Sequence, residues 1–171
     1  MEKTLYNNYP WGMVIIVNVL MLLVYVAGAY ILFLLSWITG VLYLAYLVFL
    51  ELNLYREGCV YCCYYGKRCA FGKGAIASVF FKKGDPKKFG EREMSWKGMV
   101  PQLLVVLVPV VVGIVLLVTA GWNIWILIAV IYSVLSWFVI NPIVYGKIAC
   151  PHCKQGSICC PAMKFFAKKG K

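Results

Sequence analysis

Two long apolar runs dominate the chain, and each is followed by a polar segment rich in cysteine. The first run extends from Trp11 to Leu54 with Glu51 as its only charged residue, and the second extends from Met99 to Tyr145 without a charge. A helix needs about 20 residues to cross the hydrocarbon core of a bilayer, so each run is too long for one span and suits two. The pattern therefore predicts an all-α membrane protein with four transmembrane helices in two tandem hairpins.

Glycine-containing segments near the middle of each run predict the hairpin turns, because glycine adopts turn conformations that other residues avoid. Ala27-Gly28-Ala29 is the expected break in the first run, and Ser36–Gly40 is a second possibility that would shorten the second span. Ala120-Gly121-Trp122-Asn123 is the expected break in the second run. Pro109 is expected to kink its span, and Asn141-Pro142 to bend or end the last one. The predicted spans are Trp11–Val26, Tyr30–Leu54, Val100–Thr119 and Ile124–Tyr145.

All eight cysteines fall in the two polar segments, and their spacing repeats. The pattern C-x2-C-x6-C occurs twice with an offset of 91 residues: Cys59, Cys62, Cys69 and Cys150, Cys153, Cys160. Each set has one adjoining cysteine, Cys63 in the first segment and Cys159 in the second. This repetition predicts an internal duplication. Convergence on one spacing is the alternative, since identities outside the cysteines are sparse.

The duplication divides the chain into two repeats. The first covers residues 1–98 and comprises a hairpin (11–54), a cysteine loop (58–69), a basic interfacial helix (74–83) and a polar connector (84–98). The second covers residues 99–171 and comprises a hairpin (100–145), a cysteine loop (150–160) and a basic tail (161–171). We expect the two loops to come together as one cysteine-rich module.

The distribution of charge predicts the topology. All 17 Lys and Arg lie in the N-terminus, the middle loop or the C-terminal tail, and both hairpin tips are uncharged. Basic residues stay on the cytoplasmic side of a membrane, so both termini and both cysteine loops are expected there. The net charge of +11 is thereby explained by topology and by attraction to anionic lipid headgroups, and we expect no nucleic-acid partner.

Two basic stretches are expected to lie on the membrane surface. Each places two phenylalanines near paired lysines, Phe80-Phe81 before Lys82-Lys83 and Phe165-Phe166 before Lys168-Lys169. Short helices of this kind bury aromatic rings at the headgroup boundary and keep lysines in water. Basic segments that serve only topology are the alternative. Tyr61, Tyr64 and Tyr65 are likewise expected at the membrane boundary, where aromatic residues are common.

The cysteine spacing predicts a metal site. Structural disulfides are rare in the cytosol, so clustered cysteines there are more often metal ligands or redox centres. The two sulfurs of C-x2-C can converge on one tetrahedral ion, which suits zinc or an iron–sulfur cluster. The candidate ligands are Cys59, Cys62, Cys69, Cys150, Cys153 and Cys160, with Cys63, Cys159 and His152 as additional candidates.

Two arrangements of these ligands are open. In the first, Cys59, Cys62, Cys150 and Cys153 share one four-thiolate site and the remaining cysteines form a second. In the second, each loop holds its own site with a fourth ligand from the additional candidates or from an exogenous group. The metal would act as a structural clamp or as an electron carrier.

Two other functions compete with metal binding. Cys150-Pro151-His152-Cys153 resembles the active-site tetrapeptide of the thioredoxin-like disulfide oxidoreductases, which makes a membrane thiol–disulfide enzyme the first alternative. In that family the motif opens a helix after a strand, whereas here it follows a membrane span. A small scaffold that recruits a partner subunit or a second copy is the second alternative. No carboxylate pair, Ser/His/Asp set or P-loop occurs, so the expectation leans against an enzyme.

Overall fold

The computed structural model describes residues 5–91 and 96–160, and the basic tail expected at 161–171 lies outside them. The described residues are helical, and no β-strand occurs among them. The long helices are α1 (Trp11–Leu35), α2 (Trp37–Glu57), α5 (Trp96–Thr119) and α6 (Ile124–Leu135). The short ones are η1 (Cys59–Tyr61), α3 (Lys73–Phe80), α4 (Lys87–Glu91), η2 (Ser136–Ile140), α7 (Asn141–Ile143), η3 (Val144–Ala149), η4 (Cys150–His152) and α8 (Lys154–Cys159).

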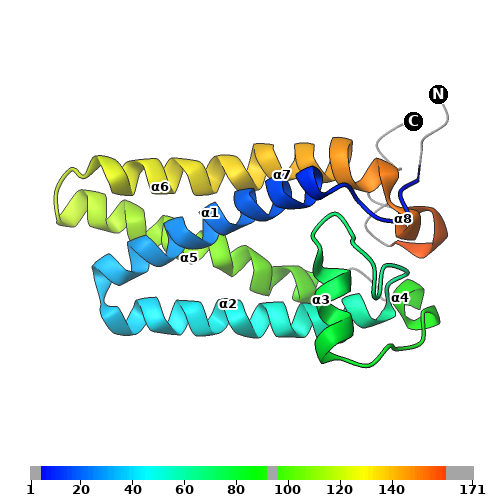
Figure 1. The fold of residues 1–171 in the computed structure, drawn as a ribbon. Coiled ribbons are helices and arrows are strands. Elements are labelled where there is room, and N and C mark those ends of the chain that lie inside the picture. Colours follow the sequence, from blue (N-terminus) through cyan, green and yellow to red (C-terminus); the bar gives the residue numbers. More distant parts are fainter. Residues whose placement is uncertain (1–4, 92–95, 161–171) are drawn as a thin grey trace. The chain divides into compact units, whose positions relative to one another are not determined.

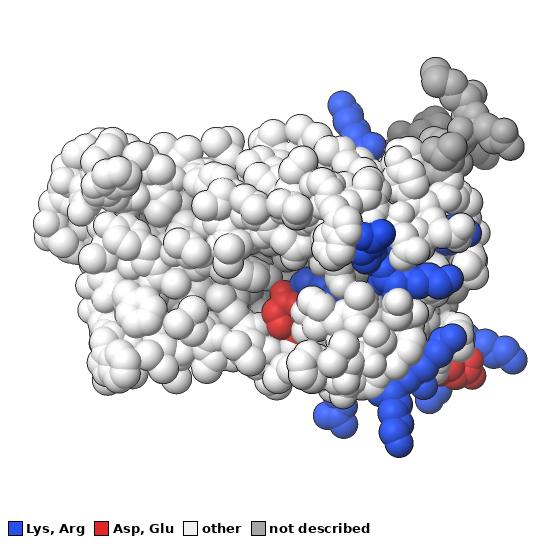
Figure 2. Space-filling model, viewed as in Figure 1, with Lys and Arg blue, Asp and Glu red and all other residues white. Residues whose placement is uncertain are grey.

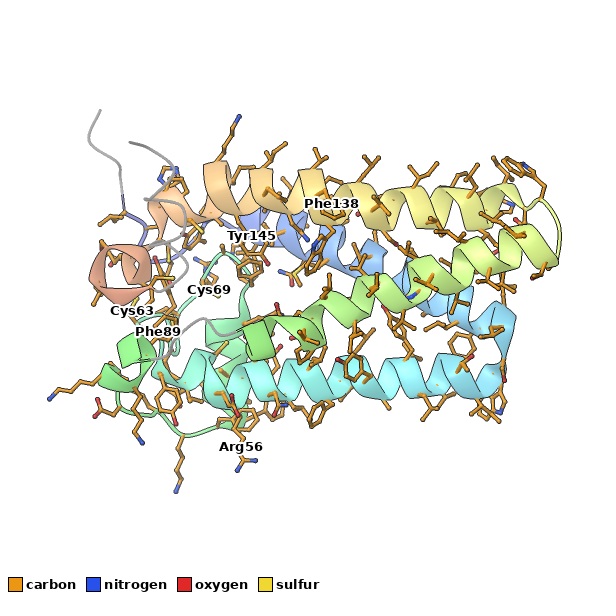
Figure 3. The ribbon with its side chains drawn as sticks, turned by 180° about the vertical axis from the view of Figure 1, so that it is seen from behind. Arg56, Cys63, Cys69, Phe89, Phe138 and Tyr145 are labelled. Atoms are coloured by element: carbon orange, nitrogen blue, oxygen red, sulfur yellow. The ribbon has the colours of Figure 1, made fainter. Side chains whose placement is uncertain are left out.

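In the described part of the chain, four helical segments are long and apolar enough to cross a membrane. They are Trp11–Leu35, Trp37–Tyr61, Val100–Thr119 and Ile124–His152. Large apolar side chains stand out from them, such as Leu42, which is 63% exposed, and Phe138, which is 71% exposed and points away from the ribbon (Figure 3). The prediction of an all-helical, multi-pass membrane protein is therefore confirmed at this level.

The chain divides into two compact units. We call them the span unit (Val19–Glu51 and Trp96–Asn141) and the cysteine unit (Met1–Asn18, Leu52–Ser95 and Pro142–Lys171). The span unit contains the two hairpin tips, and the cysteine unit contains both cysteine loops with α3, α4 and α8 (Figure 1). Lysines and arginines gather over the cysteine unit, whereas the visible surface of the span unit is almost free of charge (Figure 2).

The first hairpin turns at Ser36, so the prediction of a break at Ala27-Gly28-Ala29 is wrong. Helix α1 continues through Gly28 to Leu35, and α2 begins at Trp37. Ser36 Oγ accepts a hydrogen bond from the Ile38 N–H at 3.3 Å, as an N-cap residue does. The second possibility, Ser36–Gly40, is the segment in which the chain reverses.

Gly28 serves close packing between helices in the span unit. A Cβ atom at this position would lie 2.4 Å from Tyr43 Oη and 3.1 Å from Pro109 Cγ. The absence of a side chain therefore lets α1 approach α2 and α5 closely, which is a common use of glycine between membrane helices.

The second hairpin turns where the sequence predicts. Gly121 has φ +94°, a conformation that favours glycine, and Asn123 caps α6 by accepting a hydrogen bond from the Trp125 N–H at 2.9 Å. The helix does not end at Asn141-Pro142, because it continues through η2, α7 and η3 as far as His152. Segments η2 and η3 are π-helical. Such local widening accommodates a proline, whose missing N–H interrupts the regular ladder of hydrogen bonds.

Two apolar clusters form the core of the span unit. Helix α1 packs against α6 in the first cluster, which contains Ile31, Ile126, Ala129 and Val130. Helices α1, α2 and α5 meet in the second, which contains Leu32, Tyr43, Leu47 and Val105.

The Tyr43 hydroxyl satisfies a backbone carbonyl that Pro109 leaves without its usual donor. In an α-helix the N–H of residue 109 would donate to the carbonyl of Val105, but proline has no N–H. Tyr43 Oη donates to the Val105 carbonyl at 3.0 Å instead. Val105 is buried, so water does not replace this donor. The hydrogen bond therefore offsets the cost of a proline inside a membrane helix.

Replacing Tyr43 by phenylalanine is expected to lower the free energy of unfolding by about 1–3 kcal/mol, because a buried carbonyl loses its donor. In a Pro109→Ala background the same substitution should cost much less, since an alanine N–H at position 109 restores the helical hydrogen bond. A double-mutant cycle of unfolding in detergent measures this coupling. Equal costs in the two backgrounds would contradict the assignment.

Candidate metal centre

The two cysteine loops lie side by side in the cysteine unit, around the buried rings of Tyr9 and Tyr64. These rings are 1% and 2% exposed. Cysteines from both loops pack against this aromatic cluster: Cys62, Cys63, Cys69 and Cys153. Cys63 and Cys69 belong to the first loop, where Figure 3 labels them. Segments that are far apart in the sequence thus share one core.

Hydrogen bonds from the two tyrosines tie the segments together. Tyr9 Oη donates to the Ala149 carbonyl at 2.7 Å, which joins the N-terminal segment to the end of the last span. Tyr64 Oη donates to the Tyr6 carbonyl at 2.7 Å and accepts from the Lys154 N–H at 3.1 Å. The first loop is therefore connected through Tyr64 to both the N-terminal segment and the second loop.

Gln155 and His152 make further contacts to these segments. The Cys63 N–H donates to Gln155 Oε1 at 2.7 Å, and the Gln155 side chain is buried. The His152 ring lies against the Tyr6 ring with centroids 4.9 Å apart, and the Tyr6 N–H donates to the His152 carbonyl at 3.1 Å. The residues around the cysteines are thus held by backbone and side-chain hydrogen bonds from three parts of the chain.

Both C-x2-C motifs adopt the same local structure. Each opens with a 3₁₀ turn, η1 in the first loop and η4 in the second. The Cys62 N–H donates to the Cys59 carbonyl at 3.3 Å, and the Cys153 N–H donates to the Cys150 carbonyl at 3.1 Å. Both second cysteines then have extended backbone, with ψ 148° at Cys62 and 117° at Cys153. The two sulfurs of each motif are therefore carried on one tight turn.

Backbone N–H groups point at the sulfur of the second cysteine in each motif. The Tyr64 N–H donates to the Cys62 sulfur, and the N–H groups of Gln155 and Gly156 donate to the Cys153 sulfur. In both loops a donor comes from the residue two positions after the cysteine. Such hydrogen bonds stabilise a thiolate, and they are a usual part of the surroundings of metal-bound sulfur.

Cys153 packs against the same aromatic cluster as Cys62, Cys63 and Cys69 of the first loop. It lies close enough to interact electrostatically with Cys62 of the first loop. Within its own loop it interacts in the same way with Cys150 and Cys160, which also interact with each other. In the first loop, Cys62 interacts in this way with Cys63 and Cys69. Cysteines of both loops thus lie around one aromatic cluster.

The structure places the remaining candidate ligands as follows. Cys59 lies in η1 and is half-buried, and the side chain of Cys159 lies outside the described part of the structure. The His152 ring faces Tyr6. Among the described side chains, no three of the His, Cys, Asp and Glu groups are arranged to hold a metal ion.

Burial raises the pKa of the Cys62 and Cys153 thiols above the usual value for cysteine. The backbone N–H groups that donate to each sulfur act in the opposite direction but are outweighed. Cys62 and Cys153 are the second cysteines of their C-x2-C motifs, whereas the nucleophile of the thioredoxin-like enzymes is the first cysteine. Cys150 also lies at the end of a membrane helix and not at the start of a helix that follows a strand. The first cysteine of this motif therefore differs in its structural position from that of the thioredoxin-like family.

Three residues that organise the centre have no clear signal in the sequence: Tyr9, Tyr64 and Gln155. Tyr64, expected at the membrane boundary, is instead buried between the loops. Tyr9 immediately precedes the first span, where a tyrosine normally indicates the membrane interface. Gln155 follows Cys153 by two positions, as Tyr64 follows Cys62, and this correspondence is the one feature that could have pointed to either residue.

Comparison with known proteins adds no assignment, since no protein-family model matches the chain and neither a curated protein nor a solved structure matches it.

Proposed function

We propose that this multi-pass membrane protein binds a metal, as zinc or an iron–sulfur cluster, through thiolates of its two cysteine loops. One observation carries the proposal: C-x2-C turns of the same geometry, 91 residues apart in the sequence, place Cys62 and Cys153 against the same aromatic cluster. Two C-x2-C turns that meet are a frequent source of four-thiolate sites.

The electrostatics of the centre support the same proposal. Buried thiols without a metal remain protonated, because a thiolate in such surroundings lacks compensating charge. The backbone N–H groups of Tyr64, Gln155 and Gly156 provide part of that compensation. A metal cation would supply the rest by replacing the protons.

We propose Cys62, Cys150, Cys153 and Cys160 as the principal ligand set, because each of them interacts with Cys153 or is Cys153 itself. Cys59 and Cys69 would complete or support the first loop. Zinc–sulfur bonds are about 2.3 Å long, so the ion would draw these neighbouring thiols closer together. In this arrangement the metal clamps the two loops, and with iron–sulfur chemistry it would carry electrons at the membrane surface.

The same proposal includes an internal duplication and a cytoplasmic position for the loops. Cys59 and Cys62 correspond to Cys150 and Cys153. In each pair the N–H of the second cysteine donates to the carbonyl of the first, which closes a 3₁₀ turn. The Lys and Arg residues around the loops support the cytoplasmic side.

Metal analysis of the detergent-solubilised protein, purified without oxygen and without added metal, tests the proposal. We expect near-stoichiometric zinc in a colourless protein, or iron with a broad visible band that bleaches on reduction. Metal binding to the stripped protein should release protons, and the apparent affinity should rise with pH below the thiol pKa values, because thiolates are the ligands. Absence of metal, together with a Cys150–Cys153 disulfide that forms reversibly, would favour the thiol–disulfide enzyme instead.

A further inference from the structure

Helix α3 buries one face and exposes an apolar one. Its buried face consists of Lys73, Gly74 and Ala77, and the last of these is 0% exposed. On the other side, Ile76 is 43% exposed, Val79 76% and Phe80 74%. Spacings of three and four residues place these three side chains on one face of the helix. Helix α3 therefore presents an apolar face that the residues described by the structure leave exposed.

Contacts within the cysteine unit place the start of α3 beside the first turns of α1. Asn18 Nδ2 donates to the Phe71 carbonyl at 3.1 Å. Gly72, which has φ +69°, lies against Val14, because a Cβ atom added at Gly72 would come within 3.1 Å of Val14 Cγ1. The segment that enters α3 thus lies at the level where the first membrane helix begins.

The end of α3 lies beside the last turn of α2. The rings of Phe81 and Tyr55 are in contact, with centroids 6.5 Å apart. Tyr55 precedes Arg56, which points outwards from α2 (Figure 3), and Glu57, so these charges mark the end of the apolar part of that span. Both ends of α3 are therefore held at the depth where membrane helices pass from apolar to charged sequence.

Two exposed lysines follow the apolar face directly. Lys82 and Lys83 come immediately after Phe81 and are exposed. Figure 2 shows lysine and arginine gathered over this part of the molecule. The acyl chains of a bilayer would receive such an apolar face, and its anionic headgroups would attract the neighbouring pair of cations.

We propose that α3 lies in the plane of the membrane and inserts Ile76, Val79 and Phe80 into the headgroup boundary of a bilayer that contains anionic lipid. Lys82 and Lys83 contact the phosphate groups of these lipids. The helix thereby fastens the first cysteine loop to the membrane surface next to the ends of α1 and α2. This inference does not depend on metal binding.

A fluorescent reporter in the full-length protein tests the proposal. The Phe80→Trp variant is reconstituted into nanodiscs of phosphatidylcholine with phosphatidylglycerol, and its emission is compared with that of the wild-type protein. The added indole is expected to emit at shorter wavelength than in water and to be quenched by lipids brominated near the glycerol end of the acyl chain. Lys88→Trp, at an exposed position of α4, is the matched reporter and should not be quenched. An introduced indole at position 80 that emits as in water, without quenching, overturns the proposal.

The role of the lysines is tested in the Phe80→Trp protein. In the wild-type background of lysines, quenching should be stronger in nanodiscs that contain phosphatidylglycerol than in nanodiscs of phosphatidylcholine alone. The double substitution Lys82→Gln with Lys83→Gln is expected to remove most of this difference. Lys87→Gln with Lys88→Gln removes the same charge from exposed positions in α4 and should leave that difference unchanged. An equal loss in both pairs overturns the assignment to Lys82 and Lys83.

Discussion

Cys153→Ser is expected to abolish tight metal binding, since Cys153 interacts electrostatically with Cys62 in one loop and with Cys150 and Cys160 in the other. A structural zinc site contributes about 10–16 kcal/mol, so one of four thiolates accounts for roughly 2.5–4 kcal/mol. That loss corresponds to a decrease in affinity of about 100- to 1,000-fold. A competition titration with a coloured zinc chelator measures it on the stripped protein.

Cys63→Ser is the matched control for this experiment. Adjacent side chains point in different directions, so Cys63 is not expected to share a metal with Cys62. Its backbone N–H, which donates to Gln155 Oε1 at 2.7 Å, is retained in the variant. We expect metal content and affinity close to those of the wild-type protein. If the Cys153→Ser variant binds metal as tightly as the wild-type protein, Cys153 is not a metal ligand. If Cys63→Ser loses metal binding, Cys63 is one of the ligands.

Gly74→Ala is expected to destabilise the protein strongly, because the start of α3 rests on the backbone of the first cysteine loop. A Cβ atom at this position would lie 2.1 Å from the Tyr64 carbonyl oxygen and 2.8 Å from that of Lys67. Both are backbone atoms that cannot rotate away, and Gly74 itself accepts a hydrogen bond from the Gly66 N–H at 3.0 Å. Either α3 or the first cysteine loop must therefore move.

The expected cost of Gly74→Ala is about 3 kcal/mol, at the upper end of the range for overpacking. Thermal unfolding in detergent, followed by circular dichroism, measures it. Gly12→Ala is the control, because nothing lies within 4 Å of a Cβ atom at that helical position and alanine favours a helix by up to about 1 kcal/mol. An unchanged melting temperature for Gly74→Ala would show that α3 does not rest on the Tyr64 carbonyl.

Much of the architecture was predictable because the relevant signals are local. Charged side chains and backbone groups without hydrogen-bond partners are costly in lipid. A long apolar run without charge therefore forms a membrane helix, whatever that helix packs against. The turn at Gly121 was predictable for the same reason, since Asn123 and Gly121 favour that turn by themselves. The grouping of cysteines in two loops was likewise visible from spacing alone.

The position of the first turn was not predictable, because a glycine in an apolar run has two meanings. It marks a turn when the backbone needs a positive φ, and it marks close packing when another helix approaches. Only the contacts of Gly28 with Tyr43 and Pro109 distinguish the two. Helix α1 continues past Gly28 with Ile31 and Leu32 in its buried core, and Ser36 then caps α2 by accepting a hydrogen bond from the Ile38 N–H.

The sequence by itself therefore determined the class of the protein, the approximate spans and the residue types available for chemistry, since each depends on composition and spacing along the chain. The tertiary structure decided which thiols are neighbours, because Cys62 and Cys153 lie in loops that are far apart in the sequence. It also decided that Tyr9, Tyr64 and Gln155 hold the loops together. Such contacts depend on long-range packing and hydrogen bonding, which leave no periodic pattern in the chain.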